Sequence, residues 1–206
     1  MSIGGILLSA EERQMRRRRV REQHGLTDSE ILILHSGKFV KEKRTIDVLD
    51  AFSSYHNSDA RLFLIGSIPS SQERAINEAI ARDARIRFLG WKSSEELRDY
   101  LCAADIYLQP GTESATLQTA LCCGCPVALN MNANDIGGGY VPVLADGIVY
   151  PVENKDDLFT AIQKLSNDSQ LRAELSKKAL SFAKEKLDYT RQISKLIESR
   201  APGEHI

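Results

Sequence analysis

The sequence has almost no net charge. Its 206 residues include 27 lysines and arginines against 28 aspartates and glutamates, which gives a formal net charge of −1. Such a balance provides no overall field toward nucleic acid or anionic lipid, so we expect no nucleic-acid partner. Any anion that the protein binds is expected to be held by a local site.

Long apolar runs are missing as well. The first run, residues 3–8, is too short to span a bilayer, and its charges follow the apolar residues, which is the reverse of a signal peptide. The sequence also has no internal repeat and no low-complexity linker. It therefore predicts a soluble, cytoplasmic protein.

Cysteine is scarce, and three of the four cysteines stand in one short stretch. This distribution does not suit the disulfide framework of a small secreted domain, and it lacks the paired C-x2-C units of a structural zinc site. We interpret Cys102, Cys122, Cys123 and Cys125 as reduced intracellular thiols and expect no metal site.

What is present is a regular alternation of apolar patterns in a chain that is 42% hydrophobic, which suits one compact domain. Short β-branched runs predict buried strands at residues 31–34, 62–65, 86–89, 106–108 and 127–129. Amphipathic patterns predict helices at residues 45–55, 73–81, 95–103, 156–165, 170–184 and 189–198. This order predicts a Rossmann-like three-layer α/β/α domain with a parallel sheet, followed by C-terminal helices, and with ligands at the carboxyl ends of the strands.

We place this domain at residues 29–187, after a linker and basic helix at residues 1–28 and before a C-terminal helix and tail at residues 188–206. The basic helix, predicted at residues 11–24, contains four consecutive arginines, Arg16 to Arg19. Such a charge run is typical of a solvated or interface-facing helix, and contact with lipid or phosphate is the alternative.

The first candidate for binding chemistry is the basic stretch of residues 37–44, which follows the first strand. Gly37 allows a sharp turn, and Lys38 and Lys43 precede the start of the next helix, where an anion is favoured. The stretch suits a diphosphate, and a charged surface turn is the alternative. It is not a P-loop, because the required spacing is absent.

The second candidate is the stretch of residues 109–126, which follows a strand and contains a helix that ends at glycine and proline. Serine and threonine at the helix start predict a second anion site made of backbone N–H groups near Ser114, Ala115 and Thr116. Glu113 is either a capping carboxylate or a ligand of sugar or ribose hydroxyls.

The third candidate is the strand end at residues 88–97, where Gly90, Trp91 and Lys92 precede a Ser-x-x-Glu helix cap. Trp91 either stacks on a base or packs against the protein. His35, at the end of the first strand, is either a satisfied structural histidine or a ligand contact.

Together these stretches resemble the C-terminal, donor-binding domain of the retaining GT-B glycosyltransferases of family four, also called glycosyltransferases group 1, over roughly residues 31–184. The family's glycine–arginine and lysine–glycine pairs resemble Gly37-Lys38 and Lys43-Arg44. Its Leu-x-Gly strand end, its base-reading Phe-Leu-Gly loop and its Glu-Glu-Leu helix that leads to Ala-Ala-Asp resemble residues 64–66, 88–92 and 95–105.

One departure concerns the family's two glutamates, which stand eight positions apart. Thr119 occupies the place of the second glutamate, which in the family grips the ribose hydroxyls, and Glu113 matches the first only if the loop is two residues shorter. A threonine hydroxyl in place of a carboxylate would cost about 1–2 kcal/mol, or about tenfold in affinity.

The resemblance implies a hexosyltransferase of polysaccharide or glycolipid biosynthesis, of which this chain binds the nucleotide-sugar donor. It assigns catalytic roles to Lys38, Lys43 and Glu113, and donor binding to Gly37, Gly66, Gly90, Trp91, Lys92, Ser114, Ala115, Thr116 and Thr119. Protein cations and N–H groups would stabilise the departing diphosphate, so we expect no cofactor besides the UDP-, GDP- or ADP-linked donor.

The acceptor belongs, on the same resemblance, to an N-terminal domain or a partner subunit. We therefore expect this chain to be an excised domain or one subunit of a split enzyme, and to be inactive alone. Peripheral contact with a membrane is a further possibility for the full enzyme. The alternative function is a non-catalytic nucleotide-sugar-binding or regulatory module, which Thr119 favours. A flavodoxin-like signalling domain would need an acidic cluster at the strand ends, and the sequence has none.

Overall fold

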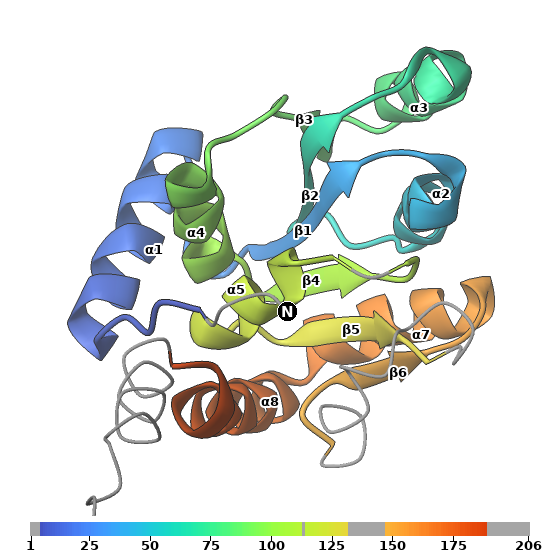
Figure 1. Ribbon diagram of the computed structural model, residues 1–206. Coiled ribbons are helices and arrows are strands. Elements are labelled where there is room, and N and C mark those ends of the chain that lie inside the picture. Colours follow the sequence, from blue (N-terminus) through green and yellow to red (C-terminus); the bar gives the residue numbers. More distant parts are fainter. Residues whose placement is uncertain (1–4, 113, 132–146, 189–206) are drawn as a thin grey trace, which may run out of the picture.

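The computed structural model describes residues 5–112, 114–131 and 147–188, which form a three-layer α/β/α domain (Figure 1). The central layer is a parallel sheet with the strand order β3-β2-β1-β4-β5-β6. The strands are β1 (Ile31–Lys38), β2 (Ala60–Ser67), β3 (Ile86–Phe88), β4 (Ile106–Gln109), β5 (Val127–Asn130) and β6 (Tyr150–Val152). The Rossmann-like α/β class predicted from the sequence is confirmed.

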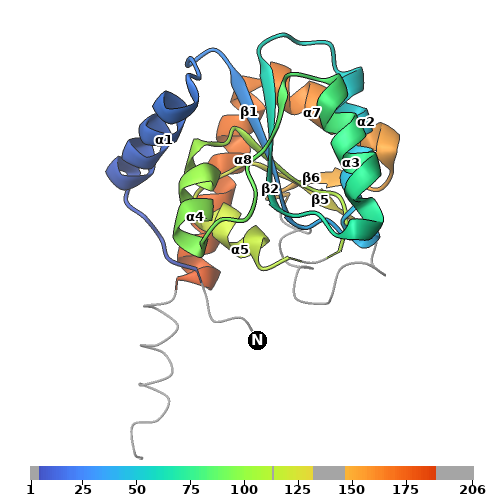
Figure 2. The ribbon, with the colours of Figure 1, turned by 90° about the horizontal axis from the view of Figure 1, so that it is seen from above.

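Helices cover both faces of this sheet (Figure 2). One face carries α1 (Ala10–His24), α4 (Ser94–Ala103) and α5 (Thr116–Cys122). The other face carries α2 (Thr45–Ser54), α3 (Ser70–Arg82) and α7 (Lys155–Asn167). α8 (Ser169–Phe182) contributes to both cores, and two short elements, η1 (Lys41–Lys43) and η3 (Ala183–Leu187), complete the described chain.

The two cores result from the alternation of side chains along the strands. On β1, Leu32 and Leu34 pack under α1 and α4, whereas Ile33 between them packs under α2. On β4, Tyr107 belongs to the first core and Leu108 to the second. Because both faces are covered, the first part of these strands is largely apolar, which is why short continuous runs predicted them.

The predicted strands and helices are present, with shifts of their ends, wherever the structure describes the chain, and we note β1 and β6 in particular. β1 continues to Lys38, so Gly37 and Lys38 lie in the strand rather than in the loop that follows it. β6 was not predicted, because three residues that include Pro151 give too little pattern. The helix predicted at residues 189–198 lies outside the described residues.

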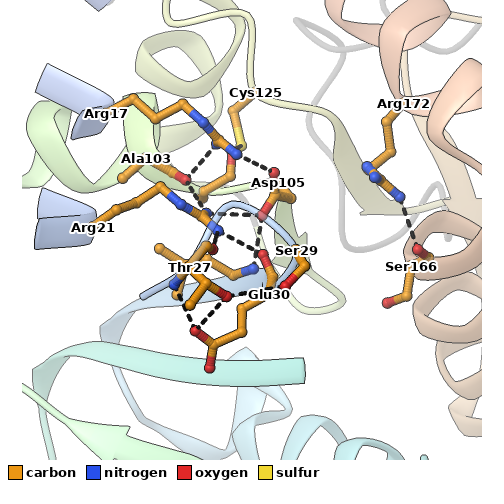
Figure 3. Close-up of polar contacts among 12 residues, drawn as sticks. Arg17, Arg21, Thr27, Ser29, Glu30, Ala103, Asp105, Cys125, Ser166 and Arg172 are labelled. Atoms are coloured by element: carbon orange, nitrogen blue, oxygen red, sulfur yellow. Dashed lines mark hydrogen bonds and ion pairs between the residues drawn. The ribbon is translucent and has the colours of Figure 1, made fainter. Parts of the chain in front are cut away.

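α1 docks on α4 through its arginines. Arg16 donates to Asp99 at 2.6 Å, and Arg17 donates to Asp105 at 2.8 Å and to the carbonyl of Ala103 at 2.7 Å. Figure 3 shows Arg17 and Arg21 converging on Asp105. The run of arginines is therefore an intramolecular interface on one side of α1, while Arg18 is exposed.

Arg21 is the most buried of these arginines, with 3% of its surface exposed. Besides its ion pair with Asp105, it donates to the carbonyls of Thr27 at 2.5 Å and Glu30 at 2.6 Å, just before β1. Asp105 also accepts from the backbone N–H of Leu32 at 2.8 Å.

Among the described residues, no helix combines the length and apolarity that crossing a membrane requires.

Candidate functional site

The candidate site lies at the carboxyl edge of the sheet, where β1 and β4 are neighbours although they are far apart in the sequence. The chain builds β1, β2 and β3 in one direction and then crosses back to place β4 on the other side of β1. Ligands of open α/β sheets bind at such a topological switch point, outside the carboxyl ends of the strands.

The loops after β1 and β4 are joined by direct contacts at this point. The N–H of Thr112 donates to the carbonyl of Glu42 at 3.1 Å, and the Lys43 ammonium donates to the carbonyl of Thr112 at 2.9 Å. Gly111 lies so close that a Cβ atom there would be 2.6 Å from Lys43 Cα and 2.1 Å from the carbonyl oxygen of Glu42. The basic stretch of residues 37–44 and the stretch that begins at residue 109 are therefore in direct contact.

The two lysines predicted to bind phosphate have different surroundings. Lys38 is exposed at the end of β1, whereas Lys43 is half-buried and is used in part to hold Thr112. Between them, Lys41 is exposed. Both lysines thus lie at the carboxyl edge of the sheet, and Lys43 also helps to hold the two loops together.

Arg44 has a backbone conformation that explains why the resembling family has glycine at this position. Its φ is 55°, in the left-handed region. Its guanidinium donates to the Asp47 carboxylate at 2.8 Å and to the carbonyls of Pro110 and Glu153, each at 3.1 Å. These three contacts hold a non-glycine residue in a strained turn and tie it to the β4 loop.

The three predicted glycines meet at the ends of three adjacent strands. Gly66 lies beside Gly37, where a Cβ on Gly66 would be 1.7 Å from the Gly37 carbonyl oxygen, and its N–H donates to the carbonyl of Gly90 at 2.9 Å. Gly37 and Gly66 have φ values of 138° and 151°. These three residues add no side chains of their own to this part of the edge, which favours close approach of a ligand to the backbone.

Trp91 and Lys92 follow these glycines. Trp91 is 72% exposed, so it does not pack in the core of this domain. The Lys92 ammonium lies 3.6 Å from the Glu96 carboxylate. Ser93 and Glu96 form the predicted capping box of α4. An exposed indole beside a glycine-lined edge is a surface on which a planar ring can stack.

The start of α5 differs from the prediction that serine and threonine cap it. Ala115 occupies the N-cap position, and the Ser114 hydroxyl accepts from the N–H of Thr116 at 3.2 Å. Ser114, Thr116 and Thr119 are half-buried and Ala115 is exposed. Glu113 lies outside the described residues.

Tyr107 and Ser36 are neighbours of this segment that the sequence did not single out. Their hydroxyls are 3.1 Å apart, and the side chains of Ser114 and Thr116 also interact with the Tyr107 hydroxyl. Burial raises the pKa of Tyr107 to about 12, so its hydroxyl stays protonated. From the sequence alone, a tyrosine in a buried strand is expected to belong to the apolar core. Its polar partners can be identified only after β1 and β4 are paired.

His35 is a structural histidine. It is 2% exposed, its Nδ1 donates to the carbonyl of Leu108 at 2.9 Å, and its Nε2 lies 3.0 Å from the Thr45 hydroxyl. Because a carbonyl oxygen only accepts, Nδ1 carries the proton, and Nε2 then accepts from Thr45. Burial lowers the pKa of His35 to about 4, so the ring is neutral and ties β1, β4 and the start of α2 together below the site.

The four cysteines are free and buried. Burial raises the pKa of Cys122 to about 11, so its thiol is protonated at neutral pH. The described residues contain no group of three or more side chains that could hold a metal ion.

Comparison with known proteins connects this geometry to a family. The family model for glycosyl transferases group 1 matches residues 16–182. The GDP-mannose-dependent alpha-(1-6)-phosphatidylinositol dimannoside mannosyltransferase of Mycobacterium tuberculosis is 32% identical over 132 residues, which is 61% of this chain and 34% of that protein. This chain thus spans about a third of that curated relative's length.

Solved structures share the fold at lower identity. Anabaena Alr3699/HepE, in complex with UDP and glucose, is 18% identical with a TM-score of 0.74, over 93% of this chain and 53% of that one. The C-terminal domain of the group 1 family protein LpcC of Francisella tularensis is also 18% identical, with a TM-score of 0.71 over 89% of this chain and 96% of that one. With most of its length matched by the family model, this chain belongs to the group 1 glycosyltransferases.

Proposed function

We propose that this chain is the nucleotide-sugar-binding half of a retaining glycosyltransferase of the GT-B fold, which transfers a hexosyl unit to a glycan or glycolipid acceptor. Family membership supports a glycosyl transfer. The Anabaena neighbour that shares the fold was solved with UDP and glucose, and the mycobacterial relative is described as GDP-mannose-dependent. Both support a nucleoside-diphosphate sugar as the donor.

The observation that carries the proposal is the joined pair of loops at the switch point. Lys43 lies between them, and Lys38 stands exposed at the end of the adjacent strand. Two lysines at this edge of the sheet provide local positive charge in a protein with a formal net charge of −1. A diphosphate bound there would meet protein cations directly, so we propose that binding needs no metal.

The rest of the donor follows from the arrangement around these lysines. The glycine-lined edge formed by Gly37, Gly66 and Gly90 gives a nucleoside room to approach the backbone, and Trp91 offers its exposed ring to the base. Lys92 would add a polar contact at the same strand end. Ser114, Ala115, Thr116 and Thr119, on the β4–α5 side of the lysines, are proposed to bind the ribose and sugar hydroxyls. The same role is proposed for Glu113, which lies outside the described residues.

The chemistry proposed for this half is stabilisation of the leaving group. As the glycosidic bond breaks, negative charge accumulates on the diphosphate, and the preorganised charges of Lys38 and Lys43 lower the energy of that state. The acceptor would be positioned by a second domain or subunit. The chain alone is therefore expected to bind the donor without transferring its sugar.

A non-catalytic nucleotide-sugar-binding module is the second candidate, and Thr119 favours it. Thr119 is half-buried on α5 and offers a neutral hydroxyl where the resembling family has a carboxylate. Thr119→Glu distinguishes the two candidates when the chain is assayed with its acceptor domain. A catalytic domain is active before the change and gains donor affinity from it, whereas a binding module shows no transfer in either form.

Calorimetric titration of the chain with UDP, GDP and ADP, and with their sugar conjugates, tests the donor class. We expect weak binding of one base series, unchanged by EDTA. Binding that requires magnesium would argue against protein cations as the diphosphate ligands, and no binding of any nucleotide would contradict the proposal.

A further inference from the structure

Gln109 is a buried amide without a partner. It is the last residue of β4 and is 3% exposed, and within the described chain neither its amide nitrogen nor its amide oxygen has a hydrogen-bond partner. The other buried unpaired side-chain atoms in this part of the protein are single atoms of Arg16, Arg21, Arg98 and Ser166. Each of these arginines uses at least one other nitrogen in hydrogen bonds, whereas the whole amide of Gln109 is unused.

The amide of Gln109 lies on the face of the sheet that carries α5. Gln109 follows Tyr107 by two positions on the strand, so both side chains leave the sheet on the same side. Its register partner on β5, Leu129, also packs in the core on that side. The polar groups on this face at the carboxyl edge are the hydroxyls of Tyr107 and Ser36, together with Ser114 and Thr116 on the connection between β4 and α5.

The chemistry of this group of residues points to a neutral, hydroxyl-bearing ligand. Gln109, Tyr107, Ser36, Ser114 and Thr116 are all uncharged, and a carboxamide donates and accepts at once, as a pair of neighbouring hydroxyls does. A phosphate would gain more from the lysines on the β1 side of the switch point. Leaving a buried amide unpaired is unfavourable, so a ligand that pairs it gains a contact that the free protein lacks.

We propose that Gln109 is a specificity-determining residue of the donor site and that its amide binds a ring hydroxyl of the nucleotide sugar. The inference rests on the proposed function. Both amide atoms are covered in the free protein, so binding of the hydroxyl requires the residues over Gln109 to move. The ring hydroxyl belongs either to the ribose or to the transferred sugar.

Gln109→Leu tests this assignment with two measurements on the full chain. Leucine has a similar volume and no polar atoms, so the variant is expected to melt about 2–4 °C above the wild type without ligand. Calorimetry with UDP, GDP, UDP-glucose and GDP-mannose is expected to show about tenfold weaker binding of the nucleotide that the wild type binds. Gln163→Leu, at an exposed glutamine on α7, is the matched control and is expected to change neither value.

The arms of the titration identify the hydroxyl. A loss of affinity confined to the sugar conjugate assigns Gln109 to the transferred sugar. An equal loss of affinity for the free nucleoside diphosphate assigns it to the ribose, and in that case the substitution has no effect on binding of the 2′-deoxynucleotide. Unchanged affinity in a folded Gln109→Leu variant overturns the inference while leaving the proposed function intact. No nucleotide binding by the wild type contradicts both.

Gln109→Met, which keeps an unbranched chain, separates a packing defect from the loss of the amide. If both variants melt below the wild type, the amide already has a partner in the free protein, such as a bound water, and the inference is wrong.

Discussion

Lys43 connects ligand binding to loop packing at the scale of a single residue. Its ammonium holds the Thr112 carbonyl at 2.9 Å, while the backbone at residues 42–43 is in close contact with Gly111. A purely sequence-based view treats a loop lysine as a free cation whose removal barely affects folding. The contact with Thr112 changes that expectation.

Lys43→Ala is expected to weaken binding of a nucleoside diphosphate about ten- to a hundredfold, because a charge-assisted contact is lost. It is also expected to lower the free energy of unfolding by about 1 kcal/mol, since the Thr112 carbonyl loses its donor at a half-buried position. Calorimetry and urea unfolding measure the two effects.

The matched control is Lys41→Ala, because Lys41 is exposed on the same loop. It is expected to stay within about 0.5 kcal/mol of the wild type in stability. Equal losses of affinity in the two variants would show that a diffuse basic loop, rather than Lys43, attracts the diphosphate.

His35 gives the fold a pH dependence whose sign follows from its burial. Its pKa is lowered from 6.5 to about 4, so below pH 6.5 the unfolded chain takes up a proton that the folded protein excludes. The free energy of unfolding therefore falls as the pH drops from about 6.5 to about 4, by up to about 3 kcal/mol from this residue. Below that range the folded protein also binds the proton, and the loss stops.

Urea unfolding at pH 7 and pH 4.5 measures this contribution by comparison with His35→Gln, which keeps polar atoms in the side chain but does not titrate. The wild type is expected to lose more stability than the variant between the two pH values. Parallel losses would mean that carboxylates, not His35, set the acid sensitivity.

Individual residues differ in how far the sequence could place them. Gly37, Gly66 and Gly90 were each predicted at a strand end, and the structure brings them together because parallel strands end at the same edge. The polar roles of Tyr107 and Gln109 could not be predicted from the sequence. Whether their polar atoms have hydrogen-bond partners is known only from the structure, in which β1 and β4 are neighbours.

At the scale of elements, the docking of α1 on α4 shows the same limit. The basic pattern predicted a helix at residues 11–24, and α1 is found at Ala10–His24. The pattern could not identify the carboxylates that neutralise the arginines, since Asp99 and Asp105 are about eighty residues away in the sequence. Whether residues 1–28 form a separate linker region stays a prediction.

Asp105→Ala is expected to lower the free energy of unfolding by about 3 kcal/mol, because it removes the partner of a buried arginine and leaves the Leu32 N–H unpaired. The side chain of Arg21 is 4% exposed, so water cannot easily replace the carboxylate. Thermal and urea unfolding check the value.

Glu95→Ala is the comparison on the same interface. The Glu95 side chain is 58% exposed, and its ion pair with Arg16 is expected to contribute at most about 1 kcal/mol. If both substitutions cost the same small amount, α1 is not anchored at Asp105.

At the scale of the whole molecule, we propose that the chain supplies one side of the donor site. It spans about a third of the mycobacterial mannosyltransferase and about half of the Anabaena structure, while it matches nearly all of the LpcC C-terminal domain. A diphosphate bound at the β1–β4 edge would thus remain open to solvent, and an acceptor would have no fixed position.

The chain alone is therefore expected to transfer no sugar to an acceptor, even where it binds the donor. Incubation with a radiolabelled nucleotide sugar and glycan or glycolipid acceptors measures this directly. Sugar transfer by the isolated chain would contradict it, whereas slow hydrolysis of the donor would not, because water needs little positioning.

The central claim, that a nucleoside diphosphate binds at the carboxyl edge of the sheet, is tested most directly by the fluorescence of Trp91. It is the only tryptophan and is 72% exposed at that edge, so its emission reports on this place alone. With EDTA present, we expect a saturable change in its emission on titration with UDP or GDP, at the same concentrations that give heat in calorimetry, and none with inorganic phosphate. Nucleotide binding detected by calorimetry without any change in Trp91 emission would place the ligand elsewhere and contradict the site.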